Sequence, residues 1–139
     1  MRDDVQRLLA GLDIGPGTDI GVGVDVEEVA RWRRPAPGLF TEAEHAHCRQ
    51  LARPAESYAG RWCAKEAVLK ALSPFLAVSP RDIEIRPGPG GMPEPHLISA
   101  AGAGWTGRLR VSIAHTSTVA VAVAIAVPLT VAGGVINRH

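Results

Sequence analysis

A strict alternation of side chains begins at Ile20 and predicts the first β-strand. Up to Val26, every second residue is a large aliphatic, and the residues between them are first glycines and then carboxylates. A period of two places these two sets on opposite faces of a strand. The face opposite the aliphatic residues holds Gly21, Gly23, Asp25 and Glu27. Because glycine lets a neighbour come close, we expect this face to meet another backbone or a ligand, with the carboxylates beside it.

Two helices are predicted next. The segment 41–44 has the form of a capping box, in which Thr41 accepts a hydrogen bond from the backbone near Glu44, so a helix is expected from there to about Leu51. Residues 55–72 are rich in strong helix formers and are followed closely by a proline. A second, longer helix is therefore expected over that range.

The rest of the chain alternates short apolar runs with turns. Strands are expected over 82–85, from about His96, over 109–113 and over 119–127, and the last two are expected to form a hairpin. The final strand alternates Val or Ile with Ala, so we expect both faces to be buried, with a helix against the alanines. The order of strand, helices and then several strands predicts an α+β fold in a single domain.

Composition excludes some broad classes. The 139 residues are 46% apolar and 21% charged, which is a globular balance. The formal net charge of +1 gives no general basic field for nucleic acid or an anionic membrane, so we expect neither partner. The longest apolar run, 119–127, is too short to cross a bilayer. Two cysteines without a secretion signal favour a reducing, cytoplasmic setting.

Candidate chemistry lies on the second helix and at two strand ends. Trp62, Glu66 and Lys70 recur every fourth residue and share one helix face. On spacing alone, Glu66 and Lys70 can equally be an exposed ion pair worth about 0.2–0.5 kcal/mol. Asp25 can be a polar residue on the solvent side of an edge strand, and His115 can be a solvated turn residue.

Three segments taken together favour the functional interpretation. Residues 23–31, 59–71 and 111–116 resemble, in order and spacing, the signature segments of the 4′-phosphopantetheinyl transferases, and most of all the short holo-acyl-carrier-protein synthase type. Residues 82–85 also match a strand that this family carries. The resemblance implies one domain, residues 20–128, with a small, mostly antiparallel sheet packed around a long central helix. Residues 1–19 are then an N-terminal extension and 129–139 a C-terminal tail.

The resemblance also implies an activity and a cofactor. Members of this family transfer phosphopantetheine from coenzyme A to a serine of an apo acyl carrier protein, and they require Mg²⁺. Asp25 and Glu66 match the two metal ligands, and Lys70 matches the lysine that contacts the pyrophosphate. These three residues form the implied catalytic set. The serine's proton acceptor stays open between Glu66 and a metal-bound water.

Further positions match binding residues of the family. Arg61 and His115 correspond to positions associated with the 3′-phosphate of coenzyme A, and Lys70 is counted with them as a cofactor contact. Arg31 corresponds to an arginine that meets the acidic carrier protein, and the arginines at 33 and 34 can extend a basic patch there. The alternative for these arginines is a solvated charge run before a proline-rich loop.

The chain also departs from the family. The stretch 32–40 is short and interrupted by prolines, where family members use a helix to receive the carrier, and Met92 replaces the basic residue of a glycine–basic–proline turn. These departures leave open a second function, a non-catalytic subunit that binds coenzyme A or a carrier protein. The family resemblance further implies a homotrimer with active sites between subunits. The residues do not distinguish carriers of fatty-acid, polyketide or peptide synthesis.

Overall fold

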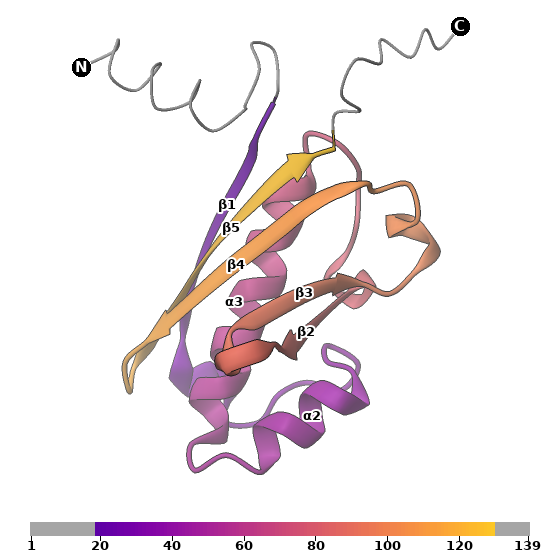
Figure 1. The fold of residues 1–139 in the computed structure, drawn as a ribbon. Coiled ribbons are helices and arrows are strands. Elements are labelled where there is room, and N and C mark those ends of the chain that lie inside the picture. Colours follow the sequence, from indigo (N-terminus) through magenta and orange to yellow (C-terminus); the bar gives the residue numbers. More distant parts are fainter. Residues whose placement is uncertain (1–18, 130–139) are drawn as a thin grey trace, which may run out of the picture.

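The computed structural model describes residues 19–129, in which one long helix packs against two antiparallel sheets (Figure 1). The larger sheet has the strand order β1-β5-β4. Its strands are β1 (Gly21–Glu28), β4 (Gly107–His115) and β5 (Val119–Pro128). The smaller sheet pairs β2 (Ile83–Pro87) with β3 (Pro93–Leu97). The predicted α+β class and the antiparallel pairing are confirmed.

Both predicted helices are present at nearly the expected bounds. Helix α2 spans Glu42–Arg49, and the Thr41 hydroxyl accepts from the Glu44 NH while the Glu44 carboxylate accepts from the Thr41 NH, which completes the predicted capping box. Helix α3 spans Pro54–Leu72 and runs behind the larger sheet (Figure 1). Its proline lies in the first turn, where the missing NH costs no hydrogen bond.

Backbone proximity explains the glycines of β1. A Cβ added at Gly21 or Gly23 would overlap the carbonyl oxygen of Ala71 or Ala67, respectively. The bare half of this strand face therefore lies directly on α3, and the neighbour expected there is a backbone rather than a ligand. This close approach brings the next residue on the same face, Asp25, alongside the helix.

The final strand is only partly as predicted. Its alanines at 120, 122, 124 and 126 are fully or almost fully buried and face the core with α3, as expected. The opposite face was expected to be buried too, and that is wrong within this chain: Val123 and Ile125 are 42% exposed. The reason is that α3 covers one side of the three-stranded sheet, and the other side carries no layer of the described chain.

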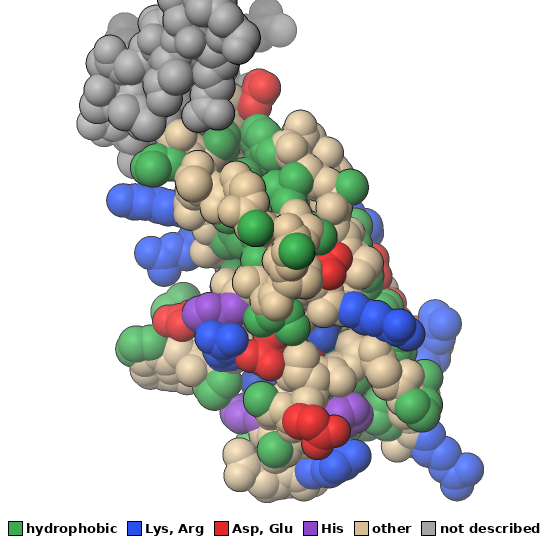
Figure 2. Space-filling model, turned by 90° about the vertical axis from the view of Figure 1, so that its right-hand side faces the viewer, with side chains coloured by type: hydrophobic (Ala, Val, Ile, Leu, Met, Phe, Trp, Pro, Cys, Tyr) green, Lys and Arg blue, Asp and Glu red, His purple; other side chains and the backbone are tan. Residues whose placement is uncertain are grey.

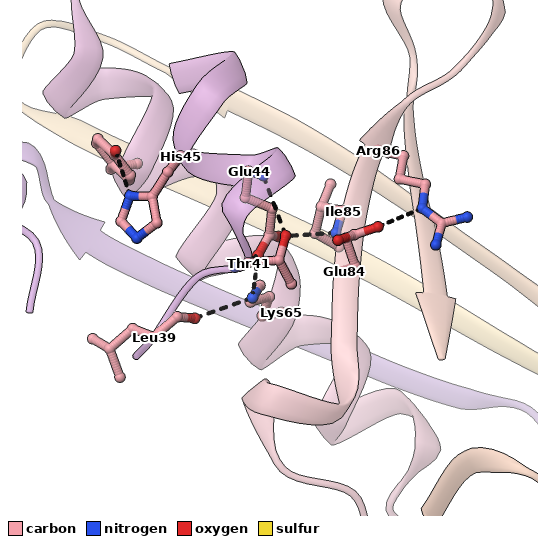
Figure 3. A network of polar contacts seen from close by, with 9 residues as sticks. Leu39, Thr41, Glu44, His45, Lys65, Glu84, Ile85 and Arg86 are labelled. Atoms are coloured by element: carbon pink, nitrogen blue, oxygen red, sulfur yellow. Dashed lines mark hydrogen bonds and ion pairs between the residues drawn. The ribbon is translucent and has the colours of Figure 1, made fainter. Parts of the chain in front are cut away.

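A buried ion pair ties α2, α3 and β2 together (Figure 3). Lys65 and Glu44 are each 1% exposed, and their charged groups lie 2.5 Å apart. The second carboxylate oxygen of Glu44 accepts from the Ile85 NH at 2.9 Å, and Lys65 also donates to the Leu39 carbonyl at 3.1 Å. The pair therefore links α2 and α3 to the backbone of β2 and of the segment before α2 by charge-assisted hydrogen bonds.

The two cysteines lie free in the core. Burial raises the pKa of the Cys48 thiol to about 11 and that of Cys63 to about 12, so both thiols stay protonated and unreactive near neutral pH. Within residues 19–129, no helix combines the length and apolarity that a membrane span requires. The extension at 1–19 and the tail at 129–139 fall almost wholly outside the described residues.

Candidate active site

Strand β1 and helix α3 bring the predicted catalytic set together. Lys70 donates to the Val24 carbonyl at 2.9 Å and lies 3.3 Å from Asp25 Oδ1. Glu66, one turn before Lys70, is close enough to feel the charges of both. Residues 45 positions apart in the chain thus meet at one point, because the glycines of β1 allow the strand to lie against the helix.

Two carboxylates, Asp25 and Glu66, face a single lysine here, so negative charge is in excess. Burial raises the pKa of Glu66, the neighbouring Asp25 carboxylate raises it further, and Lys70 offsets only part of the effect. Asp25 Oδ2 is buried and has no hydrogen-bond partner among the described residues. A buried carboxylate oxygen without a donor is costly unless a cation or ligand reaches it.

These observations fit the Mg²⁺ that the family implies. Magnesium is usually held by one or two protein carboxylates, with phosphate oxygens and waters completing its shell. Asp25 and Glu66 supply two carboxylates, and the partnerless Asp25 oxygen is available to a metal. Among residues 19–129 no group of three or more acidic, histidine or cysteine side chains is placed to enclose a metal alone. Such a site would therefore depend on substrate oxygens.

A third carboxylate lies on the same face of β1. Glu27 Oε2 accepts from the indole NH of Trp32 at 3.3 Å and lies 3.9 Å from the Arg31 guanidinium. Its charge also raises the pKa of Glu66. Glu27 was noted in the sequence only as part of the acidic face. Its partners show that it orients the segment carrying Arg31, whose side chain is 73% exposed.

Arg61 and His115, which the resemblance assigns to the same phosphate, both line one cavity of about 250 Å³. They come from α3 and from the last residue of β4, and Glu56 Oε2 lies 3.5 Å from His115 Nδ1. Within the described chain, the buried Nε of Arg61 has no partner. This cavity is thus a second place, after Asp25 Oδ2, where a buried polar atom has no hydrogen-bond partner within the described chain.

Sequence reasoning missed two residues near these sites. His47 on α2 also lines the Arg61 cavity, and Lys65 lies in the buried ion pair rather than beside Glu66. The sequence indicated only one half of this ion pair: the capping box placed Glu44 at the start of α2, but nothing in the sequence linked Glu44 to Lys65. For His47 the sequence carries no signal, since its proximity to Arg61 depends on how α2 packs on α3.

Comparisons with known proteins place these features in a family. The chain is 43% identical over 91 residues to a holo-[acyl-carrier-protein] synthase of Desulforudis audaxviator, which covers 59% of this chain and 70% of that one. It is 39% identical over 89 residues to the fatty acid synthase subunit alpha of Penicillium patulum, again over 59% of this chain but only 5% of that much longer protein.

The fold has solved counterparts. The "ACPS-CoA complex" of Chronobacterium ammoniagenes superposes with a TM-score of 0.68 at 25% identity, covering 81% of this chain and 99% of that one. The family model described as the 4′-phosphopantetheinyl transferase superfamily matches residues 21–124, which include the strand with Asp25, the helix with Glu66 and the strand with His115. The chain belongs to the 4′-phosphopantetheinyl transferase superfamily and is of its holo-acyl-carrier-protein synthase type.

Proposed function

We propose that this protein transfers the 4′-phosphopantetheine group of coenzyme A to a serine of an apo acyl carrier protein. The observation that carries the proposal is the meeting of Asp25, Glu66 and Lys70 where β1 crosses α3. The two carboxylates can hold a cation beside a pyrophosphate, and the ammonium can contact a phosphate oxygen directly. The domain that performs this is residues 20–128.

In the proposed reaction, the serine Oγ attacks the β-phosphorus of coenzyme A, the one that bears the pantetheine. A new P–O bond to the serine forms, and the bond to the other phosphate breaks, which releases adenosine 3′,5′-bisphosphate. Asp25 and Glu66 would hold Mg²⁺, which would supply charge neutralisation at the pyrophosphate. Lys70 steadies the charge that develops on the leaving phosphate. The serine proton passes to a base, for which Glu66 and a water at the same site are the two candidates.

Incubation with Mg²⁺, coenzyme A and an apo carrier protein tests this function directly. The carrier is expected to gain the mass of one phosphopantetheine, measured by mass spectrometry, and the gain should require all three components. A protein that binds coenzyme A and the carrier but leaves the carrier mass unchanged would instead be the non-catalytic subunit that the sequence left open.

Carrier binding is proposed to involve Arg31. Its guanidinium is largely exposed, and its contact with Glu27 at 3.9 Å is long, so an acidic partner can compete for it. The cluster of Arg31 with Arg33 and Arg34 is one local concentration of positive charge in a nearly neutral chain. On one face of the molecule, basic, acidic and histidine side chains are intermixed rather than gathered into one field (Figure 2).

Arg31→Glu is expected to raise the KM for the carrier by roughly tenfold or more while KM for coenzyme A stays constant, because a like charge at the rim slows association with an acidic protein. Steady-state kinetics with each substrate varied in turn measure both constants. Arg108→Glu on β4 reverses another exposed arginine and serves as the control. An increase confined to the KM for coenzyme A would assign Arg31 to the cofactor.

A homotrimer is also proposed, as the family resemblance implies. One face of the larger sheet supports it: Val22, Val24 and Val26 of β1 are 48–61% exposed, and aliphatic residues of β5 continue the same apolar surface. A contiguous apolar face of this kind marks a protein interface. The occupant proposed here is a second copy of this chain. Coenzyme A contacts are then shared between neighbouring subunits.

Sedimentation equilibrium is expected to give the mass of three chains for the wild type and a smaller species for Val24→Glu, since a buried unpaired charge opposes association. Leu51→Glu, which changes an exposed apolar residue just after α2, is the control. A monomeric wild type at micromolar concentration would contradict the trimer.

We further propose a cytoplasmic location, which the two free, buried thiols support.

A further inference from the structure

A small cavity lies between α2, α3, the end of β4 and the turn before β3. Its volume is about 250 Å³. The polar side chains of its lining are those of His47, Glu56, Ser57, Arg61 and His115. Three of these five carry nitrogen donors, and they come from three different elements. A cavity of this size and polarity suits a compact anion.

The Arg61 guanidinium is the fixed charge of the cavity. Its Nε is buried near the Cys48 thiol and has no hydrogen-bond partner among the described residues, while the side chain lines the cavity, where its guanidinium can meet a ligand oxygen. A buried donor without an acceptor is unfavourable, and a phosphate oxygen would remove that cost. This observation is independent of the resemblance that assigned Arg61 to a phosphate.

The carboxylate in the lining has two nitrogen-bearing neighbours. Glu56 Oε2 lies 3.5 Å from His115 Nδ1, and Glu56 Oε1 lies 3.7 Å from the Arg53 guanidinium. The arginine offsets the negative charge, and the carboxylate orients the His115 ring. With Nδ1 directed to Glu56, the other ring nitrogen of His115 is available to a ligand.

His47 reaches the cavity from the last turn of α2. We propose that His47 is a third donor to the 3′-phosphate of coenzyme A, beside Arg61 and His115, and that it increases the preference for coenzyme A over dephospho-coenzyme A. The inference rests on the proposed function, because it takes coenzyme A as the ligand. No signature segment of the sequence includes His47; its place beside Arg61 follows from the packing of α2 on α3.

Charge coupling gives this role a pH dependence. Burial and the charge of Arg61 lower the pKa of His47, so its ring is mostly neutral at neutral pH when the cavity holds no anion. The charged groups facing it are Arg61 and Glu56 from α3 and His115 from β4. A bound phosphate dianion favours the imidazolium, so binding takes up a proton. The contribution of His47 to affinity should therefore grow as pH falls.

Isothermal titration of the full chain with coenzyme A and with dephospho-coenzyme A tests the proposal. His47→Gln is expected to lose roughly three- to tenfold in affinity for coenzyme A and nothing for dephospho-coenzyme A, which is the effect of one ordinary hydrogen bond. The loss should be larger at about pH 6.5 than at about pH 8. The phosphate's own protonation affects wild type and variant equally and cancels in their ratio.

Two further variants make the result decisive. His96→Gln removes a half-exposed histidine that contacts Glu94 outside the cavity, and it should bind both cofactors as wild type does. His47→Arg restores a permanent charge, and it should recover the preference for coenzyme A without its pH dependence. If His47→Gln is folded by circular dichroism and discriminates between the cofactors as well as wild type, the proposal is overturned.

Failure of the proposed function has a different signature. In that case the wild type would leave the carrier mass unchanged, whatever the behaviour of His47→Gln. A wild type that transfers the group but binds both cofactors equally would reject a 3′-phosphate site in this cavity, and with it the role of His47. A wild type that prefers coenzyme A, together with a His47→Gln variant that prefers it less, supports the role of His47, and the gain in carrier mass decides the proposed function separately.

Discussion

Glu66→Gln and Asp25→Asn are each expected to lower the rate of carrier modification by roughly two to three orders of magnitude. Each change removes a negative charge from the point where β1 meets α3 while keeping the volume of the side chain. A metal that neutralises the pyrophosphate contributes several kcal/mol to transition-state stabilisation, and each 1.4 kcal/mol is about tenfold in rate. The rate at saturating coenzyme A, followed by carrier mass, measures the loss.

Thermal unfolding provides a second measurement of the same variants. In the wild type, Mg²⁺ with coenzyme A should raise the melting temperature, because a cation offsets the burial and the Asp25 repulsion that raise the pKa of Glu66. Glu66→Gln should lose most of this rise. Glu94→Gln on β3, which removes a half-exposed carboxylate, is the control for both measurements. A Glu66→Gln variant with near-normal rate at low Mg²⁺ would show that this carboxylate is no ligand.

Lys65→Met is expected to reduce the free energy of unfolding by about 3–5 kcal/mol, because it leaves the Glu44 carboxylate buried and uncompensated. The methionine keeps most of the apolar stem, so the loss comes from the charge rather than from a cavity. Urea unfolding followed by tryptophan fluorescence, at one fixed protein concentration, measures the difference.

A double variant separates charge from packing in this pair. Lys65→Met with Glu44→Gln should be more stable than Lys65→Met alone, since the amide oxygen can still accept from Ile85 or Thr41 and no charge is left buried. Arg86→Met breaks the half-exposed pair with Glu84 and should cost less than about 1 kcal/mol. If Lys65→Met and Arg86→Met reduced the free energy of unfolding equally, burial would not explain the expected large cost of losing the Lys65 pair.

These two sets of variants concern adjacent residues with different tasks. Glu66 points to the meeting of β1 and α3, where its pKa responds to Asp25 and Lys70. Lys65, one position earlier, points to α2 and β2. A rotation of about 100° per residue around a helix axis accounts for the separation. The lysine–glutamate pair of the signature segment thus combines a structural residue with a proposed catalytic one.

Much of the local structure followed from the sequence by itself. The capping box at Thr41 and Glu44 predicted the start of α2, and the alternation from Ile20 predicted β1, because both signals act within a few residues. The ordered signature segments indicated the family, which the comparisons confirm. The roles of Asp25, Glu66, Lys70, Arg61, His115 and Arg31 stay predictions that the variants above can test.

Tertiary structure alone decided which faces are buried and which distant residues meet. A period of two separates the faces of β1 but does not say which one packs, and here the glycine face lies on α3 while the valines are exposed. The same limit hid the burial of Lys65 and the place of His47 beside Arg61. Both depend on contacts between elements remote in the chain, and side-chain periodicity within one element carries no information about them.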